Sequence, residues 1–363
     1  MGQRRHAFHI ANASAATEAF PSFRCHPPMW ATKAKAWVPR QQTMAKVLIT
    51  GGGGYIGQVC AHAFLNKEWD VHLLDQVGPS SSQGFTFLVG RGCTFHRGDI
   101  RNENVMMEAM QGCTAVVHLA AISSVPQSFI DPEATMSVNV EGTETLLRVA
   151  EALAIKRVII ASSAAVYGAQ TNMPLHEGMA LETLSPYAES KRRNEEALNA
   201  CRERGMNGIA LRFFNVYGGH QILMEGNTSV IPSFIRTMAA ERAPHVLGDG
   251  LQSRDFIHVA DVALAVRALA EREAAYEAPV VNVCSNTEHS LLDIIAIIRK
   301  HLEWDWYHYE SGETTHGEER EGDIRRSLGS NTLLSSLVKW APNVTIEEGI
   351  REMIRIHMEG LGH

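Results

Sequence analysis

Two side chains of complementary chemistry lie four residues apart near the middle of the chain. Residues 187–191 read Tyr-Ala-Glu-Ser-Lys, so a helix would place the phenol of Tyr187 and the ammonium of Lys191 on one face. A free tyrosine titrates near pH ~10, and a neighbouring cation favours the phenolate. The spacing therefore predicts a phenol that accepts a proton near neutral pH. The alternative is an exposed helical pair, which any isolated Tyr-x-x-x-Lys segment allows.

A glycine-rich segment earlier in the chain indicates a nucleotide site. The apolar run 47–50 is typical of a buried strand, and a helical segment begins at Tyr55. Between and just after them, Gly51, Gly54 and Gly57 stand where a strand-to-helix turn needs a positive φ, close approach to a diphosphate, and close helix packing. The helix N-terminus would offer free N–H groups to the phosphates. A tight turn without a ligand is the alternative.

An acid after the next strand strengthens the nucleotide prediction. The strand-like run 71–75 ends in Asp75, close to the offset of roughly 20 residues at which a carboxylate binds the adenosine ribose. Its chain neighbours Gln76 and Val77 carry no cation for a 2′-phosphate, which favours NAD over NADP. With Tyr187 and Lys191, these residues predict NAD-dependent redox chemistry on an alcohol.

The elements that would position these residues alternate between strand and helix. Such alternation predicts an α/β fold with a Rossmann-like, doubly wound parallel sheet, in which residues 131–154 form one long helix. We expect the NAD-binding domain to comprise residues 44–216 and about 257–285. Two further segments, 217–256 and 286–363, do not follow this alternation of strand and helix. They predict a smaller, discontinuous substrate domain towards the C-terminus.

Composition limits the function classes. The chain has 363 residues, 45% hydrophobic and 20% charged, and its net charge of −7 argues against a nucleic-acid partner. No run of 18 apolar residues is present, so no membrane span is expected. The six cysteines are scattered without metal-ligand spacing, which indicates a reducing compartment and no metal site. We expect a cytoplasmic enzyme.

The first 43 residues differ from the rest. They contain a single acid, Glu18, and six basic residues, namely Arg4, Arg5, Arg24, Lys33, Lys35 and Arg40. This composition fits an organelle transit peptide, but we favour a mis-assigned start, because a complete enzyme would open at Met44. Under either interpretation the segment is expected to be disordered and dispensable.

Further motifs resemble the extended short-chain dehydrogenase/reductases, specifically their nucleotide-sugar epimerase branch, of which UDP-glucose 4-epimerase is typical. The resemblance runs from residue 46 nearly to the end. Besides the glycine turn and Tyr-x-x-x-Lys, it is carried by Gly98-Asp-Ile100, His118-Leu-Ala-Ala121, Asn139-Val-Glu-Gly-Thr143, Ser162-Ser-Ala-Ala-Val-Tyr-Gly168, Leu211-Arg-Phe-Phe-Asn-Val-Tyr-Gly218, Gly248-Asp-Gly-Leu-Gln-Ser-Arg-Asp-Phe-Ile-His258 and Arg320-Glu-Gly-Asp-Ile324.

The resemblance implies roles for individual residues. Tyr187 would be the base, Lys191 would also hold the nicotinamide ribose, and Ser163 would hydrogen-bond the reacting oxygen, although the adjacent Ser162 leaves a packing role for Ser163 open. His118 is expected to be a satisfied strand histidine. The implied cofactor is NAD, contacted by Gly51, Gly54, Tyr55, Ile56, Gly57, Asp75, Asp99, Ile100, Ala120 and Lys191.

The implied substrate is a UDP-sugar whose C4 is inverted through a transient 4-keto form, in a homodimeric enzyme. It would be bound by Ser128, Asn215, Arg254, Arg320 and Ser327. Another nucleotide-sugar converter, such as a uronate epimerase, a decarboxylase or a GDP- or dTDP-sugar enzyme, is the runner-up. A non-catalytic NAD sensor is the alternative of a different class.

Departures from the family pattern bear on the reaction. Ala164 and Ala165 stand where sugar 4,6-dehydratases carry an Asp-Glu pair, which disfavours that dehydration. Gly219 replaces a common proline, and residues 284–286 replace a glycine-rich turn. At Ser327 the resemblance implies a position beside the sugar's C2 substituent, where a small side chain leaves room for an N-acetyl group.

We predict that a protein starting at Met44 matches the full-length chain in melting temperature and activity, because the first 43 residues have no core to join. Thermal unfolding and an activity assay of the two forms check this. A large loss in either would show that the segment packs on the enzyme.

Overall fold

The computed structural model describes residues 44–361, except 224–228, 306–311 and 320–323. The expectation for the first 43 residues lies outside this part of the chain. Within the described residues, no helix has the length and apolar character needed to cross a membrane.

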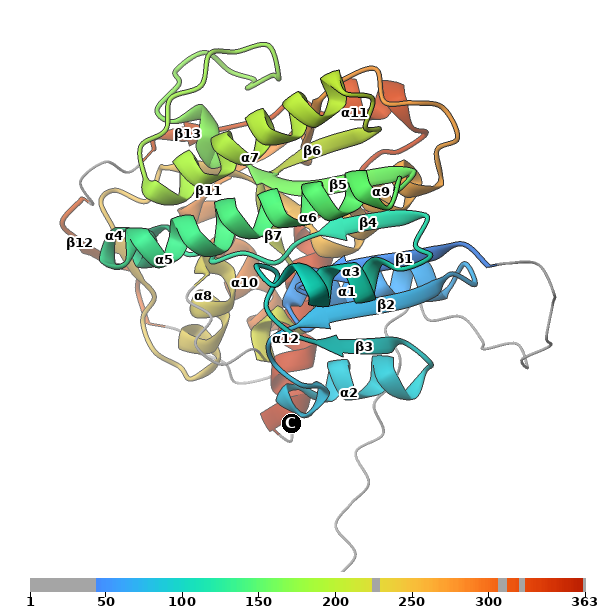
Figure 1. The fold of residues 1–363 in the computed structure, drawn as a ribbon. Helices are drawn as coiled ribbons and strands as arrows, with labels where there is room; N and C mark the ends of the chain where they lie inside the picture. Colours follow the sequence, from blue (N-terminus) through green and yellow to red (C-terminus); the bar gives the residue numbers. More distant parts are fainter. Residues whose placement is uncertain (1–43, 224–228, 306–311, 320–323, 362–363) are drawn as a thin grey trace, which may run out of the picture. The chain divides into compact units, whose positions relative to one another are not determined.

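A seven-stranded parallel sheet forms the centre of the nucleotide-binding half (Figure 1), with the strand order β10-β6-β5-β4-β1-β2-β3. The order reverses between β1 and β4, as in doubly wound sheets. This confirms the predicted fold class. The strands are β1 (Lys46–Thr50), β2 (Asp70–Asp75), β3 (Thr94–Arg97), β4 (Ala115–His118), β5 (Arg157–Ser163), β6 (Gly208–Phe213) and β10 (Val280–Val283).

Helices cover both faces of this sheet, because alternate strand residues point to opposite sides and both sides are apolar. Val47 and Ile49 join one core cluster together with residues of α1 and α9, whereas Leu48 joins the other with residues of α3, α6 and α7. The helices of this half include α1 (Tyr55–Leu65), α2 (Gln83–Gly90), α3 (Glu103–Met110), α6 (Gly142–Ala152), α7 (Pro186–Glu203), α9 (Val259–Glu271) and α11 (Thr332–Leu337).

The helix predicted over 131–154 is not uniform. It divides into α5 (Pro132–Met136), a π-helical turn (Ser137–Glu141) and α6, and a separate short helix, α4 (Val125–Ile130), precedes it. The wider π turn buries the side chain of Asn139. Such turns occur frequently at functional sites.

Smaller sheets carry the remaining segments. β9 (Ser253–His258) pairs with β7 (Asn215–Tyr217), β11 (Glu288–Ser290) and β13 (Arg326–Ser327). A second small sheet pairs β8 (His245–Leu247) with β12 (Thr315–Gly317). Their apolar core includes residues of α8 (Val230–Ala239), α10 (Leu291–Asp305) and α12 (Ile346–Leu361).

A buried carboxylate fixes β9 against the turn that follows β10. Asp255 accepts hydrogen bonds from the backbone N–H groups of Ser285, Asn286 and Gly329, at 2.7, 2.9 and 3.2 Å. Asn286 adopts a φ of 62°, a left-handed conformation that glycine and asparagine take most readily. Burial raises the pKa of Asp255 to about 6, and the bonds from Ser285 oppose that rise.

The glycine turn after β1 is set by contact between backbones. A methyl group at Gly57 would lie 2.2 Å from the carbonyl oxygen of Gly51, so α1 packs on the turn only because this position has no side chain. At Gly51, with φ of 68°, a Cβ would lie 2.8 Å from the backbone nitrogen of Ala120. The turn therefore rests directly on the segment that follows β4.

We predict that Gly57→Ala lowers the free energy of unfolding by about 1–3 kcal/mol, the usual cost of overpacking, and weakens NAD binding. The matched control is Gly90→Ala at the end of α2, where a Cβ meets nothing within 4 Å. Denaturant unfolding of both variants checks this. Equal stability of the two would contradict the packing argument.

Candidate active site

The candidate site lies where the parallel strands end, on the side at which such sheets bind ligands. The glycine turn follows β1, Asp75 ends β2, Ala120 lies just after β4, and Ser163 ends β5. Gly54 is the N-cap residue of α1 and has no side chain to cover the first N–H groups of the helix. These groups fit a diphosphate.

Asp75 holds the turn and faces the position predicted for a ribose. Its carboxylate accepts hydrogen bonds from the N–H of Gly53 at 3.0 Å and of Val77 at 3.2 Å. Asp75 has no basic neighbour in the chain. In the structure, however, Arg97 of β3 lies opposite Asp75 in register, and its Nε donates to the Gln76 carbonyl at 3.2 Å.

The other predicted cofactor residues cluster around the same sheet edge. Asp99 is ion-paired with Arg101, which lowers the pKa of the carboxyl, and it accepts a bond from Gln76. Ile100 is buried, and the Ala120 N–H donates to Thr50. Tyr55 extends away from the turn, and its hydroxyl donates to the Gly218 carbonyl at 2.6 Å. The partly buried Ile56 packs against the core cluster that contains α1.

The three predicted catalytic residues come together. Tyr187 lies in the first turn of α7, close enough to Ser163 for the serine hydroxyl to oppose the rise that burial causes in its pKa. The Nζ of Lys191 lies 5.8 Å from the centre of the Tyr187 ring and donates to the Ala161 carbonyl at 2.9 Å. The Ser162 hydroxyl instead donates to Glu195. Of the two serines, Ser163 is therefore the one that we expect to act with the phenol.

Burial dominates the electrostatics of this cluster. It raises the pKa of Tyr187, which the bond to Ser163 partly opposes, and lowers the pKa of Lys191 to about 8. The protein groups alone therefore do not produce the lowered phenol pKa that the sequence predicts. A second positive charge beside the phenol is needed.

No role was predicted for Asn139 from the sequence, although it is the first residue of the motif Asn139-Val-Glu-Gly-Thr143. Its amide accepts from the Ile122 N–H at 2.8 Å and donates to Ser190, which in turn donates to the carbonyl of Tyr187. The π turn thus connects the segment after β4 to the first turn of α7. The signal was an asparagine within the stretch predicted to form one long helix.

His118 has the structural role that was predicted. Its ring nitrogens lie 2.7 Å from the Thr50 hydroxyl and 3.0 Å from the Thr143 hydroxyl, which accounts for both. Burial and the charge of Lys191 lower its pKa to about 3, so the ring is neutral at physiological pH. A neutral ring with both nitrogens bonded has no proton to exchange with a substrate.

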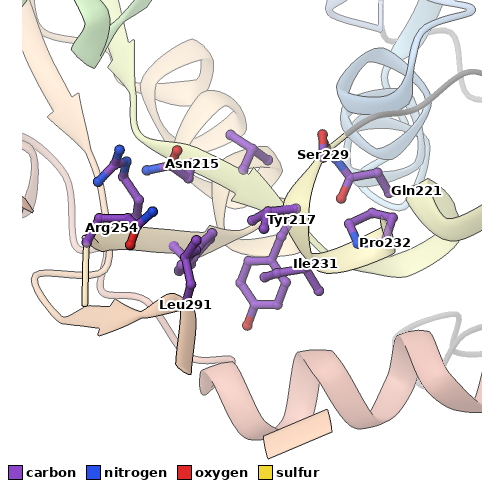
Figure 2. A pocket seen from close by; sticks show the side chains of 12 residues that line it. Asn215, Tyr217, Gln221, Ser229, Ile231, Pro232, Arg254 and Leu291 are labelled. Atoms are coloured by element: carbon purple, nitrogen blue, oxygen red, sulfur yellow. Dashed lines mark hydrogen bonds between the residues drawn. The ribbon is translucent and has the colours of Figure 1, made fainter. Parts of the chain in front are cut away.

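A cavity of about 410 Å³ opens among β7, β9 and α8. Figure 2 shows Asn215 and Arg254 on one side of it and Gln221, Ser229 and Pro232 on the other. The Asn215 amide donates to the Asp255 carbonyl at 3.0 Å. Two predicted ligand residues, Asn215 and Arg254, therefore face one cavity.

The remaining predicted substrate residues lie elsewhere. Ser327 is buried on β13, paired with Arg254 in register, but does not line this cavity. Ser128 is buried in α4, where its hydroxyl donates to the Val125 carbonyl at 2.7 Å. Arg320 lies outside the described residues.

The departure at Gly219 has a structural reason. Its φ is 52°, which proline cannot adopt. Glu352 on α12 accepts from His258 at 3.1 Å. The α12 helix packs against the turn that begins at Gly219 and so adjoins the Gly218 carbonyl that receives the Tyr55 hydroxyl.

A doubly wound sheet with a serine, a tyrosine and a lysine at its carboxyl edge defines an extended short-chain dehydrogenase/reductase. Within this class the chain belongs to the NAD dependent epimerase/dehydratase family, whose model matches residues 47–284. The cofactor is NAD, and the glycine turn, the start of α1 and Asp75 fit it. Within the described residues, no cluster of three or more His, Cys, Asp or Glu side chains is arranged to hold a metal.

Known proteins of similar sequence or structure agree with this family. A UDP-glucose 4-epimerase from Streptomyces lividans is 30% identical over 70% of this chain and 80% of that protein. The structure of a UDP-N-acetylglucosamine 4-epimerase from Methanobrevibacter ruminantium M1, in complex with UDP-N-acetylmuramic acid, has a TM-score of 0.79 and 30% identity over 87% of this chain and 99% of that one. An NDP-hexosamine 5,6-dehydratase has a TM-score of 0.75 and 28% identity, over 87% and 98%.

We predict that Asp75→Ala weakens NAD binding about tenfold or more and blurs the preference over NADP, because a hydrogen bond to a charged group contributes roughly 1.5–3 kcal/mol. The control is Asp70→Ala, the same change at the opposite end of β2. Titration of both dinucleotides checks this. Tighter binding of NADP than of NAD by the unaltered protein would contradict the assignment.

Proposed function

We propose that this protein is an NAD-dependent epimerase that inverts C4 of a UDP-sugar. The observation that carries the proposal is that Tyr187, Ser163 and Lys191 lie together, with the Lys191 Nζ 5.8 Å from the centre of the Tyr187 ring, at the sheet edge where the cofactor turn lies. A phenol held between a hydroxyl and an ammonium suits proton removal from a sugar alcohol. A UDP-sugar partner and a homodimeric state rest on the family resemblance.

Tyr187 takes the proton of the 4-hydroxyl, while Ser163 donates a hydrogen bond to the same oxygen. NAD, held by the glycine turn and Asp75, would supply a hydride acceptor and donor for C4 and, in its oxidised form, a positive charge near the phenol. Lowering the phenol pKa by ~3 units needs about 4 kcal/mol. We propose that Lys191 and this second positive charge together supply it against the opposing effect of burial. The 4-keto sugar turns over between the two transfers, so the hydride would return to the opposite face of C4, while Tyr187 returns the proton to the 4-oxygen.

Asn215 and Arg254 would anchor the nucleotide diphosphate from the cavity wall, where a guanidinium suits phosphate oxygens. Arg320 is proposed as the second arginine of this clamp. An anchored diphosphate lets the sugar rotate without leaving the site.

The alternatives differ in what they require. A 4,6-dehydratase needs acids directly after Ser163, but Ala164 and Ala165 occupy this short helical turn. Uronate epimerases, decarboxylases and GDP- or dTDP-sugar enzymes use the same scaffold and stay second candidates. A non-catalytic NAD sensor would not require Ser163, Tyr187 and Lys191 to lie together.

The test is incubation of the NAD-loaded protein with UDP-glucose, UDP-galactose, UDP-N-acetylglucosamine and UDP-glucuronate, followed by chromatographic analysis of the products. Conversion to the C4 epimer supports the proposal. Loss of carbon dioxide or water, or reaction only with a GDP- or dTDP-sugar, would assign the runner-up class.

We predict that Tyr187→Phe lowers turnover at least about a hundredfold, while fold and NAD content are kept, because general base catalysis contributes roughly 10²–10⁴. The control is Tyr276→Phe, which also removes a buried hydroxyl, one that donates to the Leu269 carbonyl. Steady-state kinetics of both variants check this. Wild-type turnover in Tyr187→Phe would remove the base from the mechanism.

We predict that the protein accepts UDP-N-acetylhexosamines as well as, or better than, UDP-glucose, and that Ser327→Tyr depresses the rate on UDP-N-acetylglucosamine far more than on UDP-glucose. By the family resemblance, Ser327 borders the sugar's C2 substituent, so a phenol ring at this position would occupy the acetamido volume. UDP-glucose is the internal control. Equal effects on both sugars, or no wild-type activity on the N-acetyl sugar, would refute the size argument. Closure of the pocket by Gly219 or the 221–229 segment is the alternative.

A further inference from the structure

A buried ion pair lies directly behind the candidate catalytic residues. Glu195 is one helical turn beyond Lys191 on α7, and Arg212 is on β6, opposite Ser162 in register. The Arg212 Nε and Nη2 donate to the two Glu195 oxygens at 2.9 and 2.7 Å, and the side chains are only 4% and 11% exposed. Taking two charges out of water costs free energy, so a buried ion pair is weak evidence of a stabilising role. The position of this pair beside the site therefore points to a different role.

Two consecutive residues of β5, directly before Ser163, are bonded to α7. The Ala161 carbonyl accepts from Lys191, and the Ser162 hydroxyl donates to Glu195. Glu195 is thus a second attachment of the strand end that carries Ser163. It is also the one of these two attachments that reaches β6, through Arg212.

We propose that Glu195 is a positioning residue for the reaction, whose carboxylate fixes the β5 end that carries Ser163 and whose charge, balanced by Arg212, acts on Lys191 and Tyr187. The inference rests on the proposed function for its catalytic meaning. It goes beyond that function because it assigns a role to the buried ion pair of Glu195 and Arg212, which is not among the residues proposed to bind cofactor or substrate.

The charged and titratable groups around Lys191 are few. Tyr187 and Glu195 belong to its own helix, and neutral His118 faces it from β4. Arg212 approaches from β6 behind Glu195 and lies 4.7 Å from the ring of Tyr167. Burial lowers the pKa of Lys191 to about 8, and the charge of Glu195 acts in the opposite direction.

Because Glu195 and Arg212 carry opposite charges, neutralising one or the other should shift the titration of Tyr187 and Lys191 in opposite directions. Glu195→Gln removes a negative charge and leaves Arg212 uncompensated, so Tyr187 and Lys191 lose their protons at lower pH. Arg212→Gln leaves Glu195 uncompensated, so both groups keep their protons to higher pH. A purely structural role would disturb the site in the same direction in both variants.

The experiment is an ultraviolet difference titration of the phenolate in the full-length, NAD-loaded protein, with Tyr187→Phe measured in parallel to subtract the other tyrosines. We expect the Tyr187 transition to move to lower pH in Glu195→Gln and to higher pH in Arg212→Gln. The control Glu196→Gln removes the adjacent, exposed carboxylate that pairs with Arg192 and should leave the transition unchanged. Shifts in the same direction, or no shift, overturn the proposal.

Ser162→Ala removes no charge and carries the test if the buried-charge variants fail to fold, which thermal unfolding reports. We expect about a tenfold loss of turnover, equivalent to 1.4 kcal/mol in the barrier, with no shift of the Tyr187 titration. Wild-type turnover in Ser162→Ala overturns the positioning role. If the titrations shift as expected but no UDP-sugar is converted, the proposed function fails and the electrostatic role of Glu195 stands.

Discussion

Backbone touches backbone at the carboxyl edge of the large sheet, and the site depends on this contact. Gly51 lies so close to Ala120 that neither the turn after β1 nor the segment after β4 tolerates a side chain between them. The contact places the turn before α1 against the segment that follows β4. Since β4 lies between β1 and β5, the same segment separates the cofactor turn from the strand that ends in Ser163.

Hydrogen bonds then transmit this geometry to the catalytic helix. Asn139 connects the segment after β4 to Ser190 in α7, while Ala161 and Ser162 at the end of β5 are bonded to the same helix. The start of α7 is thus held from β4 and from β5. This double support explains how a tyrosine near a helix N-terminus, where ends commonly fray, can stay beside Ser163.

The fold and the central residues were predictable because their signals are local. The glycine spacing, the acid after β2 and the Tyr-x-x-x-Lys interval each follow from one strand or one helical turn. The contribution of Glu195 was not predictable, because its partners Ser162 and Arg212 lie on two strands far from it in sequence. The π turn at 137–141 was likewise hidden, since the apolar pattern of a helix continues through it.

The two unusual turns show how this chain accommodates its departures from the family pattern. Asn286 takes a left-handed conformation and keeps its N–H on Asp255, the anchor beside Arg254. Gly219 takes a positive φ that proline cannot adopt, in a turn that packs on α12 and adjoins the Gly218 carbonyl bound by Tyr55. The glycine turn after β1 has no such freedom, because its contacts admit no larger side chain.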